Sequence, residues 1–141
     1  MCGYGCIGLC FRAPGSHQAD HSSRWNVISI VMKRYCQTLT LVDNPELVEK
    51  YIEVHSHVWP EVIAGQREVG ILSMEIYRWG RSLFMIMDTV DDFDFARDMA
   101  RLATLPRQAE WEAYVSQFQD CSADASSADK WQMMEKVFDS E

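Results

Sequence analysis

Pro60 lies in the middle of a helical pattern and limits how the first half of this chain can fold. Apolar side chains recur at helical spacing on both sides of it. Proline cannot donate the backbone hydrogen bond of a helix interior, and it disfavours helical geometry at Trp59. The pattern therefore predicts two shorter helices, from Pro45 to about Val58 and from Pro60 to about Glu68. A break at this point would open space beside His55.

Alternating and helical patterns predict the other elements. Residues 33–42 alternate between two faces and are rich in β-branched and aromatic side chains, which is typical of a strand. Asp43 or Asn44 caps the first helix, and Pro45 suits the first helical position. The remaining predicted elements are strands at 71–79 and 83–88 joined by a turn at 80–82, a helix capped by residues 91–94 that ends near Ala103, a helix from Leu105 to about Phe118, a loop at 119–129 and a strand at 130–138.

This order of elements predicts an α+β fold of the ferredoxin-like type, with an antiparallel sheet and helices on one face. The strand at 83–88 is almost wholly apolar, which indicates that it is buried on both faces. Because the helices would cover only one face, we expect a second copy of the sheet to cover the other. The sequence thus predicts a homodimer.

Composition restricts the partners. Hydrophobic residues make up 48% of the chain, which is enough for a core, and the length of 141 residues suits one domain. The net charge of −8 repels phosphate groups, which argues against nucleic acid and membrane partners. A neutral small molecule is not disfavoured. No apolar run approaches the roughly 20 residues of a membrane-spanning helix.

Residues 1–31 differ from the rest of the chain, because glycine, serine, proline and histidine are frequent and no periodicity persists. We expect this segment to be a disordered or non-native N-terminal extension, followed by one α+β domain at residues 32–141. The cysteines match no standard metal site and no convincing disulfide framework, which predicts reduced thiols and a cytoplasmic location. They are Cys2, Cys6, Cys10, Cys36 and Cys121.

The stretch from Tyr51 to Glu61 is the richest in chemistry. Tyr51 and His55 are four residues apart and would project from the same face of a helix. An imidazole with a pKa near 6.5 can give and take protons at neutral pH. Aromatic faces pack against the C–H faces of sugars, so these residues suit proton transfer on a neutral polyol. The residues alone leave open a structural role, with Tyr51 and Trp59 in the core and His55 hydrogen-bonded internally.

Four segments and one signature carry a family resemblance. They are MKRYCQTLTLVDNPELVEKYIEVHSHVWPEV, MEIYRWGRSLFMIMDTVDDFDF, QAEWEAYVSQFQ, KWQMMEKVF and the pattern Tyr-x-x-x-His…Trp-Pro-Glu. Residues 32–138 resemble the L-rhamnose/L-fucose mutarotases, small sugar epimerases with a dimeric α+β barrel. The resemblance implies an isomerase that interconverts the anomers of a 6-deoxyhexose. The rhamnose branch has a tyrosine where Met74 stands and a Trp-Trp pair at Glu110-Trp111, so we expect L-fucose first and L-rhamnose next.

The resemblance also implies roles for individual residues. His55 is expected to be the acid–base group that opens and closes the sugar ring. No metal or organic cofactor is expected, and His57 is expected to be exposed. The expected substrate-binding residues are Tyr51 and Tyr77, which orient hydroxyls, Trp59 and Trp111, which shape the pocket, Glu75, which holds a hydroxyl, and Met74.

Two other functions are compatible with the fold and these residues. Dimeric ferredoxin-like barrels also include small monooxygenases and haem-degrading proteins. An axial haem histidine needs an apolar cavity of porphyrin size, which Tyr51 and Glu75 fit poorly. The other alternative is a non-catalytic sugar-binding or dimerisation module. Measurement of anomer exchange separates this module from an enzyme.

Overall fold

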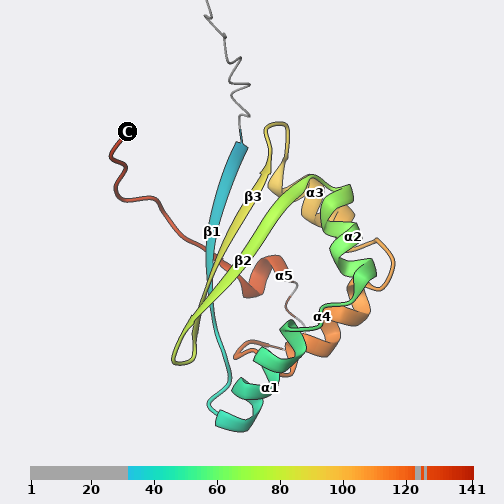
Figure 1. Ribbon diagram of the computed structural model, residues 1–141, viewed down its shortest axis with the longest axis vertical. Helices are drawn as coiled ribbons and strands as arrows, with labels where there is room; N and C mark the ends of the chain where they lie inside the picture. The colour runs from blue at the N-terminus through green and yellow to red at the C-terminus, as the bar shows by residue number, and fades with distance from the viewer. Residues whose placement is uncertain (1–31, 123–124, 126) are drawn as a thin grey trace, which may run out of the picture.

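The computed structural model describes residues 32–122, 125 and 127–141 (Figure 1). The predictions for residues 1–31, including the extension and its three cysteines, lie outside the described residues. The described elements form a mixed α+β fold. In chain order they are β1 (Met32–Thr40), α1 (Pro45–His55), α2 (Pro60–Glu68), β2 (Ile71–Trp79), β3 (Ser82–Val90), α3 (Phe95–Leu102), α4 (Gln108–Ser116), α5 (Ser127–Lys130) and β4 (Gln132–Met133).

The described strands form one antiparallel sheet in the order β2-β3-β1-β4. β1 pairs with β3 along its whole length, from Met32 opposite Val90 to Thr40 opposite Ser82. β2 and β3 form a hairpin whose turn contains Gly80 at φ 58°, a conformation that suits glycine. The first and third strands are therefore neighbours at the centre of the sheet, which confirms the predicted ferredoxin-like topology.

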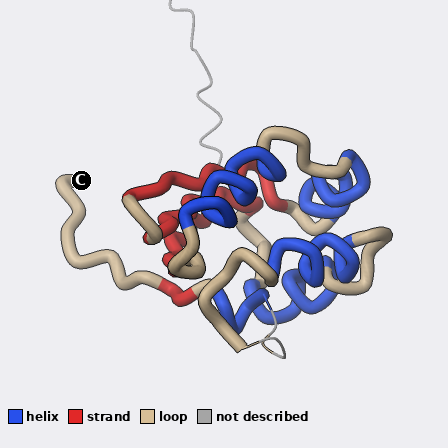
Figure 2. The backbone as a smooth tube through the Cα atoms, turned by 90° about the horizontal axis from the view of Figure 1, so that it is seen from below, coloured by secondary structure: helices blue, strands red, loops and turns tan. Residues whose placement is uncertain are grey.

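Helices α1 to α4 lie on one side of the sheet, as predicted (Figure 1), and Figure 2 shows them from below. α1 begins after Asn44, whose Oδ1 accepts hydrogen bonds from the backbone N–H groups of Glu46 and Leu47. It ends at His55 rather than near Val58. α2 begins at Pro60, so the proline breaks the helical run where the sequence predicts.

Two buried apolar clusters fill the space between the sheet and the helices. The first, which we call the α1–α4 cluster, consists of Leu39, Leu41, Val48, Tyr51, Val62, Leu83, Trp111, Val115 and Phe118. The second, the α2–α3 cluster, consists of Val69, Ile71, Met87, Phe93 and Leu102. Their strand residues come from the face that is covered by the helices, and along β3 every second residue is buried because successive strand residues face opposite sides of a sheet.

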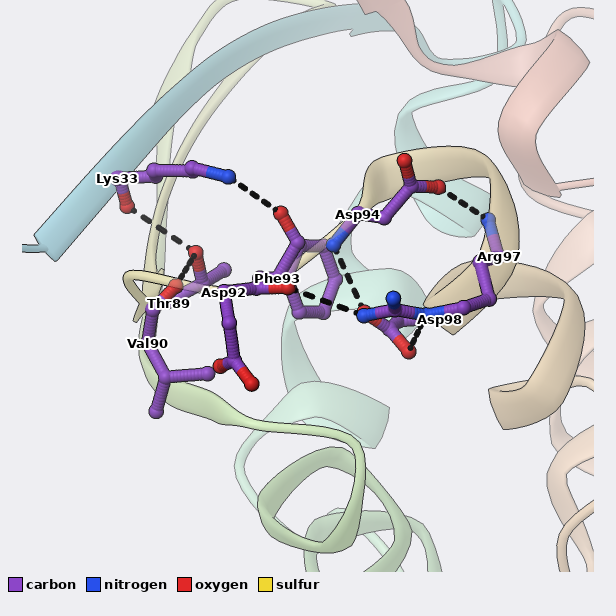
Figure 3. Close-up of polar contacts among 8 residues, drawn as sticks. All are labelled: Lys33, Thr89, Val90, Asp92, Phe93, Asp94, Arg97 and Asp98. Carbon is purple, nitrogen blue, oxygen red and sulfur yellow. Dashed lines mark hydrogen bonds and ion pairs between the residues drawn. The ribbon is translucent and has the colours of Figure 1, made fainter.

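Hydrogen bonds tie the start of α3 to the sheet beside the α2–α3 cluster (Figure 3). Lys33 Nζ on β1 donates to the backbone oxygen of Phe93 at 2.8 Å. The Asp98 carboxylate accepts from the backbone N–H of Asp94 at 2.8 Å and from the Arg97 guanidinium at 2.7 Å. Asp94 in turn accepts from the backbone N–H of Arg97 as the N-cap of α3. These bonds fix the loop that leads into α3.

The predicted strand at 130–138 is wrong over most of its length. The end of the predicted loop and the first residue of the predicted strand form α5 (Ser127–Lys130), and only Gln132–Met133 pair with β1, opposite Thr38 and Gln37. The segment then leaves the sheet, and Val137 and Phe138 are 90% and 80% exposed. A strand pattern in the sequence indicates which residues could be buried, but it does not show that they pair with a partner. Here pairing stops soon after Met133, although β1 itself continues to Met32.

The face of the sheet opposite the helices has no cover among the described residues. Phe84 and Ile86 of β3 lie on this face and are half-buried, and Arg34 pairs there with Asp88 at 2.7 Å. At its edge, the Trp79 side chain is 88% exposed. None of the helices in the described residues has the length and apolarity needed to cross a bilayer.

Candidate active site

A cavity of about 310 Å³ lies between the sheet and the helices and touches both apolar clusters. Its size is at the small end of ligand pockets, which span roughly 300–1,000 Å³. The apolar part of the lining comes from aromatic, methionine and aliphatic side chains. The polar groups of the lining belong to Gln37, Tyr51, His55, Gln66, Gln108, Glu112, Gln119 and Ser127.

His55 and Tyr51 form the pair that helical spacing predicts. Their ring centroids are 3.9 Å apart with planes 31° from parallel. His55 Nδ1 lies 2.9 Å from the backbone oxygen of Tyr51, a bond in which Nδ1–H is the donor and the carbonyl is the acceptor. This bond selects the neutral tautomer whose Nε2, on the other side of the ring, is free to accept a proton. His55 is thus oriented by its own helix.

Burial sets the protonation states of this pair. Desolvation lowers the pKa of His55 below 6.5, although the hydrogen bond to the Tyr51 carbonyl opposes that effect. Desolvation raises the pKa of the Tyr51 phenol well above its usual value of 10. At neutral pH the site therefore holds a neutral imidazole that can act as a base and a phenol that remains a hydrogen-bond donor.

Aromatic rings form one wall beside His55. Trp111 of α4 meets the imidazole edge-to-face at 5.3 Å, and Trp59 meets Trp111 in the same way at 5.4 Å. The Arg107 guanidinium lies 4.0 Å from the centre of the Trp59 ring on its face. Trp59 can reach this position because the chain is extended at Trp59, immediately before Pro60. The helix break therefore brings an indole from the α1–α2 junction onto α4.

The structure brings four of the predicted site residues together. Tyr51, His55, Met74 and Trp111 all line the cavity. Trp59 stands behind Trp111 and does not itself line the cavity. His57 is exposed, as predicted.

Glu75 and Tyr77 are not brought to this cavity. Met74 faces it from β2, so its strand neighbour Glu75 faces the opposite side of the sheet, and so does Tyr77. There the Tyr77 hydroxyl donates to the Glu75 carboxylate at 2.7 Å. The hydrogen bond to Glu75 is the largest cause of the raised pKa of the Tyr77 phenol.

Several polar residues of the lining were given no role from the sequence, and three of them are Gln37, Gln108 and Glu112. Gln37 stands on the same strand face as Leu39, so a polar side chain on an apolar face was the available signal. Gln108, Trp111 and Glu112 follow helical spacing and lie on one face of α4. A search for polar residues on otherwise apolar faces would have found all three.

Metal ligands do not gather in the described part of the chain. No group of three or more histidine, cysteine, aspartate or glutamate side chains is placed there to hold an ion. The chemistry that the described cavity supports is proton transfer by His55, with amide, carboxyl and phenol groups available for hydrogen bonds to a neutral ligand.

Known proteins resemble this chain in sequence and in fold. A family model described as L-rhamnose mutarotase matches residues 34–140. An L-fucose mutarotase from Xanthomonas campestris is 38% identical over 109 residues, which cover 76% of this chain and 87% of that relative. A UPF0734 protein from Dictyostelium discoideum is 34% identical over 111 residues, 76% of this chain and 89% of the relative.

Among solved structures, an L-rhamnose mutarotase from Formosa agariphila superposes with a TM-score of 0.60. It is 21% identical, and the match covers 77% of this chain and 99% of that structure. This likeness shows a shared fold.

Proposed function

The chain belongs to the L-rhamnose mutarotase family and is a carbohydrate isomerase, and we propose that it interconverts the α and β anomers of L-fucose, with L-rhamnose next in preference. The observation that carries the proposal is His55, a half-buried imidazole oriented by the Tyr51 carbonyl at the wall of a cavity of about 310 Å³. Ring opening of a free sugar needs a neutral base beside a small cavity that also holds hydrogen-bonding groups.

The proposed reaction passes through the open-chain aldehyde. His55 Nε2 takes the proton of the anomeric hydroxyl, and the imidazolium that forms gives a proton to the ring oxygen as the bond between that oxygen and C1 breaks. Rotation about the C1–C2 bond presents the other face of the aldehyde to the hydroxyl that was formed from the ring oxygen. Closure forms the C1–O bond again, and the two proton transfers reverse. Atoms and protons balance, so neither a co-substrate nor an oxidant takes part.

The other cavity residues hold the sugar in this proposal. The Tyr51 phenol stays protonated at neutral pH and donates a hydrogen bond to a sugar oxygen. Trp111 and Met74 present apolar surface to the C–H faces and to the 6-methyl group. Trp59 supports the sugar pocket by holding Trp111 in place.

We rank L-fucose above L-rhamnose as the substrate because of two similarities in sequence. The L-fucose mutarotase from Xanthomonas campestris is 38% identical to this chain. In addition, Met74 and Glu110 stand where the rhamnose branch has a tyrosine and a tryptophan. The family model is described by L-rhamnose, which keeps that sugar as the second substrate.

We also propose that the protein works as a homodimer in the cytoplasm. The uncovered face of the sheet presents Phe84 and Ile86, and a second copy is the partner of matching shape and polarity. Glu75 and Tyr77 lie on this face and would meet the partner sheet. Sedimentation velocity should give twice the chain mass of 16.3 kDa. The thiols of Cys36 and Cys121 are both free, which suits a reducing compartment.

Magnetisation-transfer NMR between the anomers tests the reaction directly. The protein should accelerate exchange of L-fucose above the rate in buffer, L-rhamnose less so, and D-glucose least. If none of the three sugars exchanges faster with the protein present, the proposed function is wrong. Binding of L-fucose without faster exchange would instead identify a sugar-binding module.

A further inference from the structure

Two residues that line the cavity each have a buried amide oxygen without a hydrogen bond. The two oxygens are Oε1 of Gln37 on β1 and Oε1 of Gln108 on α4, in residues that are 2% and 6% exposed. Buried polar atoms in native proteins nearly always have a partner, so each exception calls for an explanation. In the part of the chain that the structure describes, no other buried side-chain nitrogen or oxygen lacks a partner.

The two exceptions share one location, although they come from distant parts of the chain. Gln37 reaches the cavity from the central strand of the sheet, where it stands opposite Met85 of β3. Gln108 reaches it from the first turn of α4, beside Trp111. A packing defect would have no reason to place both orphaned atoms in residues that line the cavity beside His55. Their shared position indicates a ligand that supplies the missing partners.

The chemistry of the two atoms restricts that ligand. Each is an amide oxygen, which accepts hydrogen bonds and carries no full charge. The Gln108 amide is held in place because its Nε2 donates to Glu112 Oε1 at 3.0 Å. A neutral hydroxyl is the donor that suits such an acceptor, and two acceptors on different walls require a ligand with at least two separate hydroxyls.

We propose that Gln37 and Gln108 are specificity-determining residues, each of which accepts a hydrogen bond from a different hydroxyl group of the sugar. This inference rests on the proposed function, because it takes the ligand to be the monosaccharide on which His55 acts. The sugar would then form polar contacts with the sheet through Gln37 and with α4 through Gln108, in addition to its contacts with the Tyr51–His55 pair. A sugar that lacks one of the two hydroxyls leaves an amide unpaired and binds less tightly.

The main test is Gln37→Leu, which keeps the size of the side chain and removes the acceptor. Its KM for L-fucose should rise by about tenfold with a smaller change in kcat, the order expected for one lost hydrogen bond. The melting temperature without sugar should stay unchanged or rise, because an unpartnered buried oxygen is removed. The rise in melting temperature that L-fucose causes in the parent should shrink. Gln117→Leu, at an exposed position on the same chain, is the matched control.

Deoxy sugars give a second readout that does not depend on the variant's stability. The parent protein should bind one monodeoxy analogue of L-fucose more weakly than L-fucose, and Gln37→Leu should bind the two equally. If Gln37→Leu lowers the melting temperature without sugar and leaves KM unchanged, the amide is structural and the inference is wrong. Should Gln37→Leu fail to fold, equal binding of every monodeoxy analogue by the parent would overturn it. Absence of anomer exchange in the parent rejects the proposed function instead.

Discussion

The polar groups beside the α1–α4 cluster and those beside the α2–α3 cluster differ in whether the chain itself supplies their hydrogen-bond partners. Beside the α2–α3 cluster, the loop into α3 is closed by bonds within the chain: Lys33 caps a carbonyl and Asp98 accepts from a backbone N–H and from Arg97. On the cavity side, Gln37 and Gln108 each keep an unpartnered oxygen. Beside the α2–α3 cluster, the polar groups form hydrogen bonds that stabilise the fold. Beside the cavity, the amide oxygens of Gln37 and Gln108 remain able to accept hydrogen bonds from a ligand.

From this difference we expect substitutions beside the cavity to affect activity and substitutions in the α2–α3 cluster to affect stability. Removal of a group beside the cavity takes away contacts that only the sugar completes. Removal of a group from the α2–α3 cluster takes away contacts that the folded chain already makes. The three predictions below use this contrast.

His55→Ala should have the largest effect, and it should be on activity. Loss of the acid–base group lowers catalysed anomer exchange by about 10²–10⁴-fold. The melting temperature should change little by comparison, because His55 is only half-buried. His57→Ala, at an exposed position two residues away, is the control and should keep parent activity. Equal exchange rates for parent and His55→Ala would show that another group moves the proton.

Phe93→Ala should reverse this pattern. The Phe93 side chain is 1% exposed in the α2–α3 cluster, and truncation of such a ring costs about 3–5 kcal/mol of unfolding free energy. Urea unfolding should reveal this loss, while the kcat of the molecules that remain folded stays near that of the parent. Phe138→Ala, at a side chain 80% exposed, should change the unfolding free energy by less than about 0.5 kcal/mol. A large fall in kcat for Phe93→Ala would remove the contrast.

The smallest expected effects are those of pH. Protonation should affect the cavity and the α2–α3 cluster in different pH ranges. Burial lowers the pKa of His55 below 6.5, so the base is neutral at pH 7 and catalysed exchange falls as the pH drops through that lowered pKa. The same group stabilises the fold above pH 6.5, a contribution that is lost over the same range.

Asp98 titrates in a lower window. The Arg97 guanidinium and the Asp94 N–H lower its pKa from 3.8 to about 2, so its stabilising contribution is complete above pH 3.8 and is lost as the pH falls through about 2. As the pH is lowered from 8 to 2, the exchange rate should therefore fall first, together with the part of the melting temperature that depends on His55. The melting temperature should fall again below pH 3.8 as Asp98 is protonated, and the absence of this second fall would contradict the role of Asp98.

Sequence patterns predicted most of the fold. The strand at 33–42, the helix break at Pro60 and the hairpin after Trp79 were confirmed to within a few residues. These features depend on neighbours a few positions apart, which is the range over which helical and strand periodicity act. The strand at 130–138 failed because its existence depends on a partner that the pattern does not contain.

The lining of the cavity was predicted only in part. Of the residues assigned to the sugar from the sequence, Tyr51, His55, Met74 and Trp111 line it, and the alternation of β2 already placed Glu75 and Tyr77 on the opposite face from Met74. Alternation does not say which face of a sheet the helices will cover, so the assignment of Glu75 and Tyr77 to the sugar could not be judged from sequence. Gln37 was visible on an apolar strand face, but its significance depends on having no partner.

Helical spacing places Tyr51 and His55 together, since one turn of helix fixes that distance whatever surrounds it. Only the packed fold shows that this pair lines a cavity, and that the same cavity is lined by Gln37 and Gln108, whose buried amide oxygens have no partner. Spacing within an element is set by backbone geometry. The packing of β1 against α4 depends on contacts between residues far apart in the chain, which no local pattern encodes.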